Sequence, residues 1–250
     1  LGQIAPVSIF LNESGSDDIE MDEIEIALAR SVAEWTTPSC TILEMEYGGL
    51  TAVEQIGYNF DNPEENINIL YFYRENWPFQ PGILALTATS YRNSTGEILD
   101  ADIRVNDQYF SFSTTDNPDE VIYDLRNALT HETGHMLGFD ENPEHPESTM
   151  FPGSTSGELI KRDLNQDDII AICDTYPAEG YTPSRSFLPS DPAGTPDNSG
   201  CRQRNGHVST EAILVYMVML LLGFYMRGGH CRRSPIALST GKVEQSQDGC

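Results

Sequence analysis

Residues 131–141 read HETGHMLGFDE, and this stretch determines how the rest of the chain is interpreted. Two histidines, His131 and His135, are four residues apart, so a helix places both imidazoles on one face. Zinc binds histidine nitrogen at about 2.0–2.1 Å, and two imidazoles in this arrangement can share one ion. Glu132, beside the first histidine, would then project toward a water molecule on the metal. The stretch therefore predicts a helix that carries a metal site.

Two glycines of this stretch favour the same interpretation. Gly134 costs a helix about 1 kcal/mol relative to alanine, which is expected where another element packs closely against it. Gly138 can adopt the left-handed conformation that ends a helix, and the chain can then return a third ligand to the metal. The alternative is that both histidines are ordinary surface or core side chains of an amphipathic helix.

At these residues the chain resembles the metzincin zinc endopeptidases, whose extended signature is HExxHxxGxx followed by a third ligand. Met150, within residues 148–152 (STMFP), is similar to the Met-turn of that family. The nearest subgroup is matrixin-like, and the resemblance covers approximately residues 5–177. It implies a catalytic domain with a twisted, mainly parallel sheet of about five strands, a Zn²⁺ cofactor, and Met150 as an apolar floor beneath the metal.

The third ligand departs from the matrixin pattern. The position ten residues after His131 holds Glu141 instead of histidine, and a carboxylate oxygen binds zinc at about 2.0–2.2 Å. His145, within the proline-bracketed residues 142–146, is the alternative, because another path of that loop would deliver its imidazole. Glu141 is the first choice, and both remain open at this point.

The resemblance implies hydrolysis of peptide bonds in extracellular proteins. A metal-activated water would attack the carbonyl, with Glu132 as general base and then as proton donor to the leaving amine. A second hypothesis is a catalytically silent, metzincin-like binding or adhesion module, in which the altered third ligand leaves the metal affinity too weak. Zinc content together with cleavage of a protein substrate separates the two.

Two further pairs of residues are candidate sites. Asp100 and Asp102 alternate onto one face of a strand, where they could hold a structural cation such as Ca²⁺, as the corresponding family region often does. A solvated edge strand is the simpler interpretation. Cys40 and Cys173 could form a disulfide, which would require export to an oxidising compartment, or remain free thiols.

Composition limits the class of protein. The chain has 250 residues, 39% of them hydrophobic, which is enough for a core, so a wholly disordered chain is not expected. Acidic residues outnumber basic ones by 39 to 14, giving a formal net charge of −25. Such a charge repels a phosphate backbone, so nucleic acid is not expected as a partner.

The order of the expected elements indicates an α+β fold, because helices follow a cluster of strands. We expect strands at residues 6–11, 41–46, 67–73, 83–90, 98–105 and 109–113. The first helix should span residues 18–35, with Ile24, Leu28, Val32 and Trp35 on one face. The second should begin with Asn117 as cap and Pro118 and end at Gly138, and the third should begin near Asn165, with Asp167 and Asp168 as capping and dipole residues.

The last 70 residues predict a different organisation. We expect a catalytic domain at residues 1–180, a disordered Pro-rich and Ser-rich linker at 181–210, a transmembrane or sorting helix at 211–227 and a basic tail at 228–250. The uncharged run at 212–226 spans roughly 22 Å as a helix, a marginal membrane span. With Cys201 as a processing site, the tail resembles myxobacterial-type surface-sorting tails. This predicts an exported protein, secreted or anchored at the cell surface.

Overall fold

The computed structural model describes residues 6–117, 119–183 and 243–249 of the chain. Its main sheet has the order β2-β1-β3-β5-β4, in which the first four strands are parallel and β4 runs antiparallel to β5. The strands are β1 (Val7–Asn12), β2 (Met45–Thr51), β3 (Asn68–Phe72), β4 (Ala85–Arg92) and β5 (Glu97–Val105). A further strand, β8 (Val243–Gly249), pairs antiparallel with the other side of β4.

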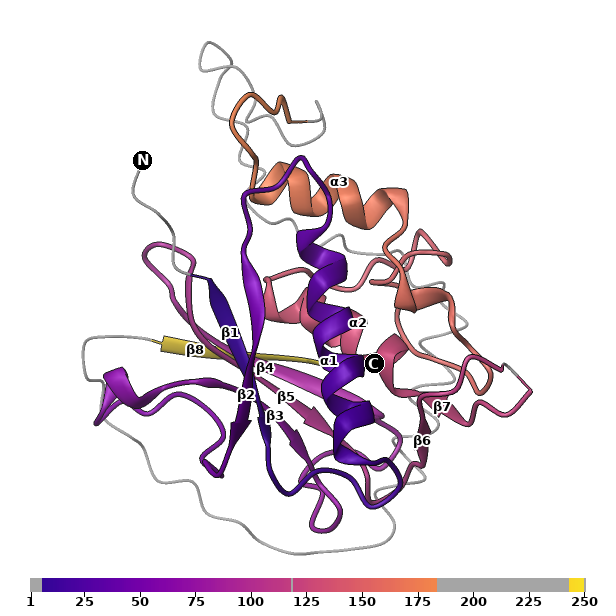
Figure 1. The fold of residues 1–250 in the computed structure, drawn as a ribbon. Helices are drawn as coiled ribbons and strands as arrows, with labels where there is room; N and C mark the ends of the chain where they lie inside the picture. The colour runs from indigo at the N-terminus through magenta and orange to yellow at the C-terminus, as the bar shows by residue number, and fades with distance from the viewer. Residues whose placement is uncertain (1–5, 118, 184–242, 250) are drawn as a thin grey trace, which may run out of the picture. The chain divides into compact units, whose positions relative to one another are not determined.

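Three helices accompany the sheet: α1 (Met21–Thr36), α2 (Leu125–Met136) and α3 (Gln166–Thr175). Figure 1 shows α1 and α2 side by side over the sheet, with α3 above them in that view. The core lies between these layers, where Ile9, Leu11 and Ile103 of the sheet meet Leu28 of α1 and Leu129 of α2. The expected α+β class and mainly parallel sheet are therefore confirmed.

Short elements complete the described fold. Two-residue strands, β6 (Phe112–Ser113) and β7 (Tyr123–Asp124), pair with each other in parallel and leave the rest of the predicted strand 109–113 outside any sheet. Single 3₁₀ turns, η1 (Pro63–Glu65) and η2 (Ile160–Arg162), lie in the connections.

The buried face of α1 follows the sequence pattern, since Ile24, Leu28, Val32 and Trp35 are all buried. The predicted start at residue 18 is wrong, because α1 begins at Met21. The Asp18 N–H donates to the Ser16 hydroxyl at 3.0 Å, and such local side-chain bonds compete with the helical conformation.

The predicted start of the second helix is also wrong, because α2 begins at Leu125. Asp124 is the cap: its Oδ1 accepts the Asn127 N–H at 2.7 Å, which satisfies one of the free donors of the first turn. Arg162 holds that carboxylate through its Nε at 2.8 Å and its Nη2 at 2.5 Å. A buried aspartate so paired fixes where α2, and hence its histidines, begins.

Asn117 has a different role from the predicted helix cap. Its Oδ1 accepts the Asp119 N–H at 3.2 Å, which forms a local turn ahead of β7. Ile122 precedes the helix and is 49% exposed. The helix end is as predicted, since Gly138 has φ +87° and directly follows the C-cap Leu137.

The third helix begins as the sequence predicts. Asn165 and Asp168 form a reciprocal capping box, in which the Asn165 N–H donates to Asp168 Oδ2 at 2.9 Å. The box satisfies two donors of the first turn of α3. This turn also contacts the segment that contains Met150, as described below.

The second strand lies later than residues 41–46, where we expected it. Thr41 Oγ1 and the Ile42 N–H both donate to the Tyr176 carbonyl, at 2.7 and 3.0 Å. This segment is therefore bound to the end of α3 instead of the sheet, and β2 continues through Gly48, where an added Cβ would come within 2.7 Å of the Phe10 ring. Close packing against Phe10 explains why a glycine lies inside a strand.

A disulfide joins Cys40 to Cys173 of α3, with the two Cα atoms 5.3 Å apart. The Cys40 carbonyl also accepts the Ala178 N–H at 2.8 Å. The sequence left this pairing open against two free thiols. Through it, the segment after α1 is linked covalently to the helix that follows the HETGHMLGFDE stretch.

The predicted segments of the tail lie outside the described residues, except that β8 comes from the stretch assigned to the basic tail. The transmembrane or sorting helix at 211–227, Cys201 and nearly all of the linker at 181–210 belong to the part that the structure does not describe. Among the described residues, no helix is both long enough and apolar enough to cross a membrane.

Gly134 has a packing role inside α2. A Cβ at this position would lie 2.7 Å from Trp35 Cζ2 and would also overlap the Sδ of Met150. We therefore expect Gly134→Ala to destabilise the fold by about 1–3 kcal/mol through overpacking, although alanine favours a helix by about 1 kcal/mol. Urea unfolding measures the change. Gly82→Ala is the control, because nothing lies within 4 Å of a Cβ there, and an equally stable Gly134→Ala would contradict the packing.

The disulfide gives a second prediction. Mass analysis after alkylation of the unreduced full chain should show Cys40 and Cys173 unmodified. Reduction should lower stability by about 2–5 kcal/mol, because the bond closes a loop with a sequence separation of 133 residues. Alkylation of both thiols without prior reduction would contradict the bond.

Candidate metal centre

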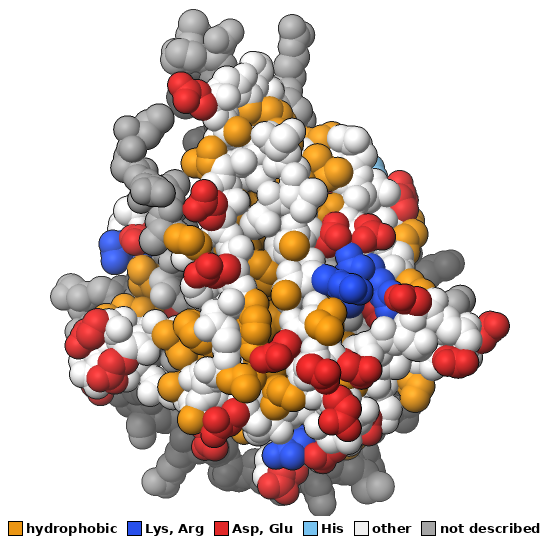
Figure 2. Space-filling model, viewed as in Figure 1, with side chains coloured by type: hydrophobic (Ala, Val, Ile, Leu, Met, Phe, Trp, Pro, Cys, Tyr) orange, Lys and Arg blue, Asp and Glu red, His pale blue; other side chains and the backbone are white. Residues whose placement is uncertain are grey.

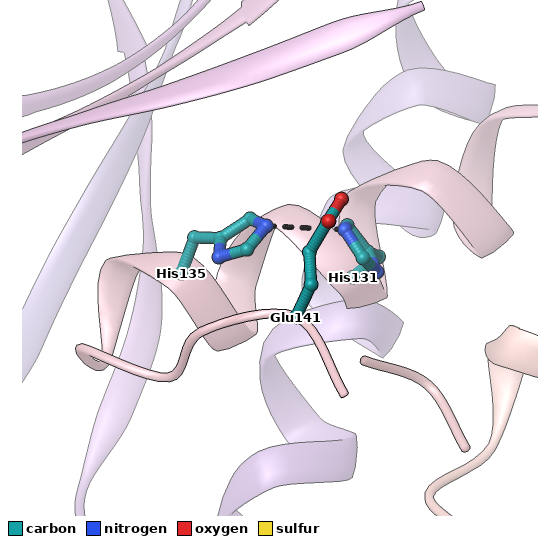
Figure 3. Close-up of side chains that lie close together, drawn as sticks. All are labelled: His131, His135 and Glu141. Carbon is teal, nitrogen blue, oxygen red and sulfur yellow. Dashed lines mark hydrogen bonds between the residues drawn. The ribbon is translucent and has the colours of Figure 1, made fainter. Parts of the chain in front are cut away.

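The two histidines of α2 face each other in the interior. His131 and His135 are 0% and 2% exposed, and their rings meet edge to face with centroids 4.7 Å apart. The two Nε2 atoms lie 3.1 Å apart (Figure 3). Two nitrogens bonded tetrahedrally to one zinc at about 2.0–2.1 Å would be about 3.3–3.4 Å apart. The pair is therefore close to the spacing of two ligands on a common ion.

The other ring nitrogens establish which atoms carry hydrogen. The Nδ1 of His131 lies 2.7 Å from the Thr149 carbonyl, and the Nδ1 of His135 lies 2.7 Å from the Phe139 carbonyl. A carbonyl oxygen only accepts, so each Nδ1 donates, and in a neutral ring each Nε2 then carries a lone pair. Two lone pairs at 3.1 Å repel unless a cation lies between them.

Protonation of His131 is a poor source of that cation. Burial, followed by the neighbouring His135, lowers the pKa of His131 to about 3, although the bond to the Thr149 carbonyl acts in the opposite direction. The ring is therefore neutral across the physiological range, which is the form that binds a metal. This arrangement is the usual one for metal-binding histidines, whose second nitrogen donates to a carbonyl or carboxylate.

Glu141 completes a group of three. One carboxylate oxygen of Glu141 and one nitrogen of each imidazole all lie within 4.8 Å of one another. Figure 3 shows the glutamate projecting from the loop after α2 toward both rings. Gly138, with φ +87°, makes the turn that brings this loop back. Two nitrogens and one carboxylate oxygen form a donor set that suits Zn²⁺ and leaves a fourth position for water or substrate.

His145, the alternative third ligand, lies elsewhere. Its Nε2 is 3.6 Å from Asp167 Oδ1 at the start of α3, and 46% of its side chain is exposed. It is not part of the group formed by His131, His135 and Glu141. The loop path in the structure therefore favours the carboxylate.

Glu132 is wholly buried beside the first histidine. Thr87, on β4, donates from its Oγ1 to Glu132 Oε2 at 2.6 Å. This threonine is itself 1% exposed. The sequence analysis missed it, since an isolated threonine in a strand carries no signal before the topology places β4 beside α2.

Met150 lies beneath the histidine helix. It is 4% exposed and packs in a cluster with Trp35, Leu137 and Ile172. Trp35 in turn donates from its indole nitrogen to the Thr130 carbonyl of α2 at 2.8 Å. The expected apolar position of Met150 next to the candidate metal ligands is consistent with this packing.

Asp168 links the first turn of α3 to the Met150 segment. Its carboxylate accepts the Thr149 N–H at 2.8 Å and the Met150 N–H at 3.2 Å, in addition to the Asn165 N–H. Burial raises the pKa of Asp168, while these three N–H donors act to lower it. The Thr149 peptide thus bonds Asp168 through its N–H and His131 through its carbonyl. The sequence identified the capping role but not this second one.

Asp100 and Asp102 are both buried, at 3% and 1% exposed, so the expectation of a solvated edge strand is wrong. Asp102 accepts the Ile69 N–H at 2.9 Å and the Gly57 N–H at 2.5 Å, which binds the loop after β2 to the sheet. Asp100 Oδ2 is buried without a hydrogen-bond partner. Among the described residues these two are not part of any group of three potential metal ligands, so a structural cation here remains a prediction.

A groove of about 400 Å³ opens beside His135. It is lined by Thr89 and Tyr91 of β4, Ile98 of β5, and Gly138 and Asp140 after α2. His135 thus forms part of the wall of this groove, although it is only 2% exposed. No model of a known protein family matches the chain.

The acidic pair gives a pH prediction. Burial, followed by the charge of Asp102, raises the pKa of Asp100 to about 7, and burial raises the pKa of Asp102 to about 6. A carboxyl whose pKa is higher in the folded state stabilises the fold when protonated, and this contribution is lost as pH rises through the folded-state value. Stability should therefore fall between about pH 4 and pH 7.

We expect Asp100→Asn to remove part of this loss. The variant should be more stable than the unaltered chain at pH 8 by about 1–3 kcal/mol, because no buried charge forms. Urea unfolding at pH 5 and pH 8 measures the difference, with the exposed Asp61→Asn as control. An equal loss of stability with rising pH in Asp100→Asn would contradict the assignment.

Proposed function

We propose that this chain is a zinc-dependent endopeptidase of the metzincin type, matrixin-like in subgroup. The observation that carries the proposal is the convergence of two imidazole lone pairs and a carboxylate. Both Nδ1 atoms are bonded to carbonyls, so both Nε2 lone pairs face each other at 3.1 Å, with Glu141 beside them. A divalent cation bound by these three groups, with one coordination position left open, would remove the repulsion between the two lone pairs.

The residues have separate tasks in the proposed reaction. His131, His135 and Glu141 would hold Zn²⁺, which when bound supplies a Lewis acid that activates water and polarises a peptide carbonyl. Glu132, buried beside His131, would accept the proton of the attacking water and then deliver it to the departing amine. Thr87 would hold the glutamate in place through its bond to Oε2.

The distribution of charged side chains on the surface favours protein or peptide substrates over nucleic acid. Figure 2 shows acidic side chains spread over the viewed face, with the largest group of basic side chains in one patch and smaller basic groups elsewhere. Three arginines, Arg30, Arg126 and Arg162, line a small pocket, and two of them are paired: Arg126 with Glu34 at 2.7 Å and Arg162 with Asp124 at 2.5 Å. Paired guanidinium groups offer little to a phosphate backbone.

The proposed location is outside the cell, with the tail of the chain as an anchor or sorting signal. A disulfide between Cys40 and Cys173 is typical of an oxidising compartment, and it supports export. Membrane attachment by residues 211–227 and processing at Cys201 remain predictions.

Glu132→Gln tests the proposed chemistry. The full-length variant should hold about one zinc per chain, as we expect of the unaltered protein, and its kcat/KM on an unfolded protein substrate should be about 10²–10⁴-fold lower. His135→Ala should lose zinc and activity together. Metal analysis and a cleavage assay measure both, with Asp61→Asn as a control that changes neither.

The alternative function gives a different result. A silent binding or adhesion module would fold normally and would cleave no substrate, in the unaltered chain or in any variant. This result would hold whether or not the module bound zinc. Activity that survives in Glu132→Gln, or that chelation leaves unchanged, would refute the proposed mechanism.

A further inference from the structure

Asn142 directly follows the third candidate ligand, and all of its polar groups are used. Its N–H donates to the Met150 carbonyl at 2.7 Å, and its Nδ2 donates to Asp167 Oδ2 at 2.7 Å. Its Oδ1 accepts the Glu144 N–H at 3.2 Å, which turns the chain away from the site. Residue 142 is therefore fixed in position and orientation.

The residues before Glu141 are also held. Phe139 donates its N–H to the Gly134 carbonyl at 3.1 Å and accepts from the His135 ring at 2.7 Å. Its own ring stacks on Trp35 with centroids 5.3 Å apart. The residues before Glu141 are thus bonded to α2, and Asn142, the residue after it, is bonded to Met150 and Asp167.

Asp167 connects this loop to the platform that orients His131. It is the second residue of α3, next to Asp168, whose carboxylate binds the Thr149 and Met150 N–H groups. The first turn of α3 therefore holds the Met150 segment with one aspartate and Asn142 with the other. Asp167 Oδ1 also lies 3.6 Å from His145 Nε2.

We propose that Asn142 and Asp167 are positioning residues that make Glu141 the third metal ligand and keep His145 from that position. The inference rests on the metal site of the proposed function. Asp167 Oδ2 accepts from Asn142, the residue after Glu141, and Asp167 Oδ1 lies beside His145. Neither Asn142 nor Asp167 contacts the metal or the substrate; both act through Glu141.

Zinc affinity of the full-length chain, measured by competition with a chromophoric chelator, tests this. Asn142→Ala and Asp167→Ala should each weaken zinc binding about 10- to 100-fold, the range found when partners that orient a metal ligand are removed. The double variant should bind zinc much more tightly than the sum of the two single effects would give, because the bond between the two side chains is lost in each single variant.

Asp167→Asn is the matched control. It removes the same charge as Asp167→Ala but keeps an oxygen that accepts from Asn142 Nδ2, so its zinc affinity should stay within about threefold of the unaltered chain. Thermal unfolding of the metal-free variants checks that a lower affinity does not reflect a damaged fold. His145→Ala should leave the affinity unchanged.

Two outcomes would overturn the inference separately from the proposed function. Zinc binding by the unaltered chain, with equal affinity in Asn142→Ala and Asp167→Ala or a loss in His145→Ala, would refute the positioning role alone. A chain that binds no zinc at all would refute the metal site itself, and the inference with it.

Discussion

The hydrogen bonds from two imidazole Nδ1 atoms to backbone carbonyls are the constraint on which the candidate site depends. Thr149 supplies one carbonyl and Phe139 the other, each 2.7 Å from its ring nitrogen. Because a carbonyl cannot donate, the tautomer of both rings is determined, and so is the direction of both remaining lone pairs. The proposal of a metal between the two Nε2 atoms starts from this geometry.

Much of the remaining fold serves to hold those two carbonyls in place. Phe139 is placed by the turn at Gly138 and by its stacking on Trp35. Thr149 is placed by Asp168, whose bonds to the Thr149 and Met150 amides fix the peptide from the side opposite to His131. The disulfide to Cys40 attaches the last turn of α3 to the segment after α1.

The sequence predicts the parts of this arrangement that have a periodic or local signal. The i, i+4 pair His131 and His135, the helix end at Gly138 and the capping box of Asn165 are all read from short patterns, and the structure has each of them. The start of α2 was predicted at the wrong residue because the Asn-Pro signal forms a turn, while Asp124 depends on Arg162, which lies 38 residues away. Local rules cannot detect such a partner.

Other residues of the site depend on tertiary contacts in the same way. Thr87 reaches Glu132 across 45 residues of sequence, and the buried Asp102 accepts the N–H groups of Gly57, in the loop after β2, and of Ile69 in β3. The positions of Glu141 and His145 are likewise a matter of loop path, along which Asn142 bonds to Met150 and Asp167. Sequence spacing identified both residues as candidates and favoured Glu141, but it could not give the loop path.

Anomalous diffraction at the zinc absorption edge, from crystals of the full chain grown with zinc, is the most direct test of the central claim. We expect one strong peak at about 2.0–2.2 Å from His131 Nε2, His135 Nε2 and a carboxylate oxygen of Glu141. A peak bonded to His145 in place of Glu141 would contradict the assigned ligand set. The absence of any peak between the two imidazoles would contradict the metal site.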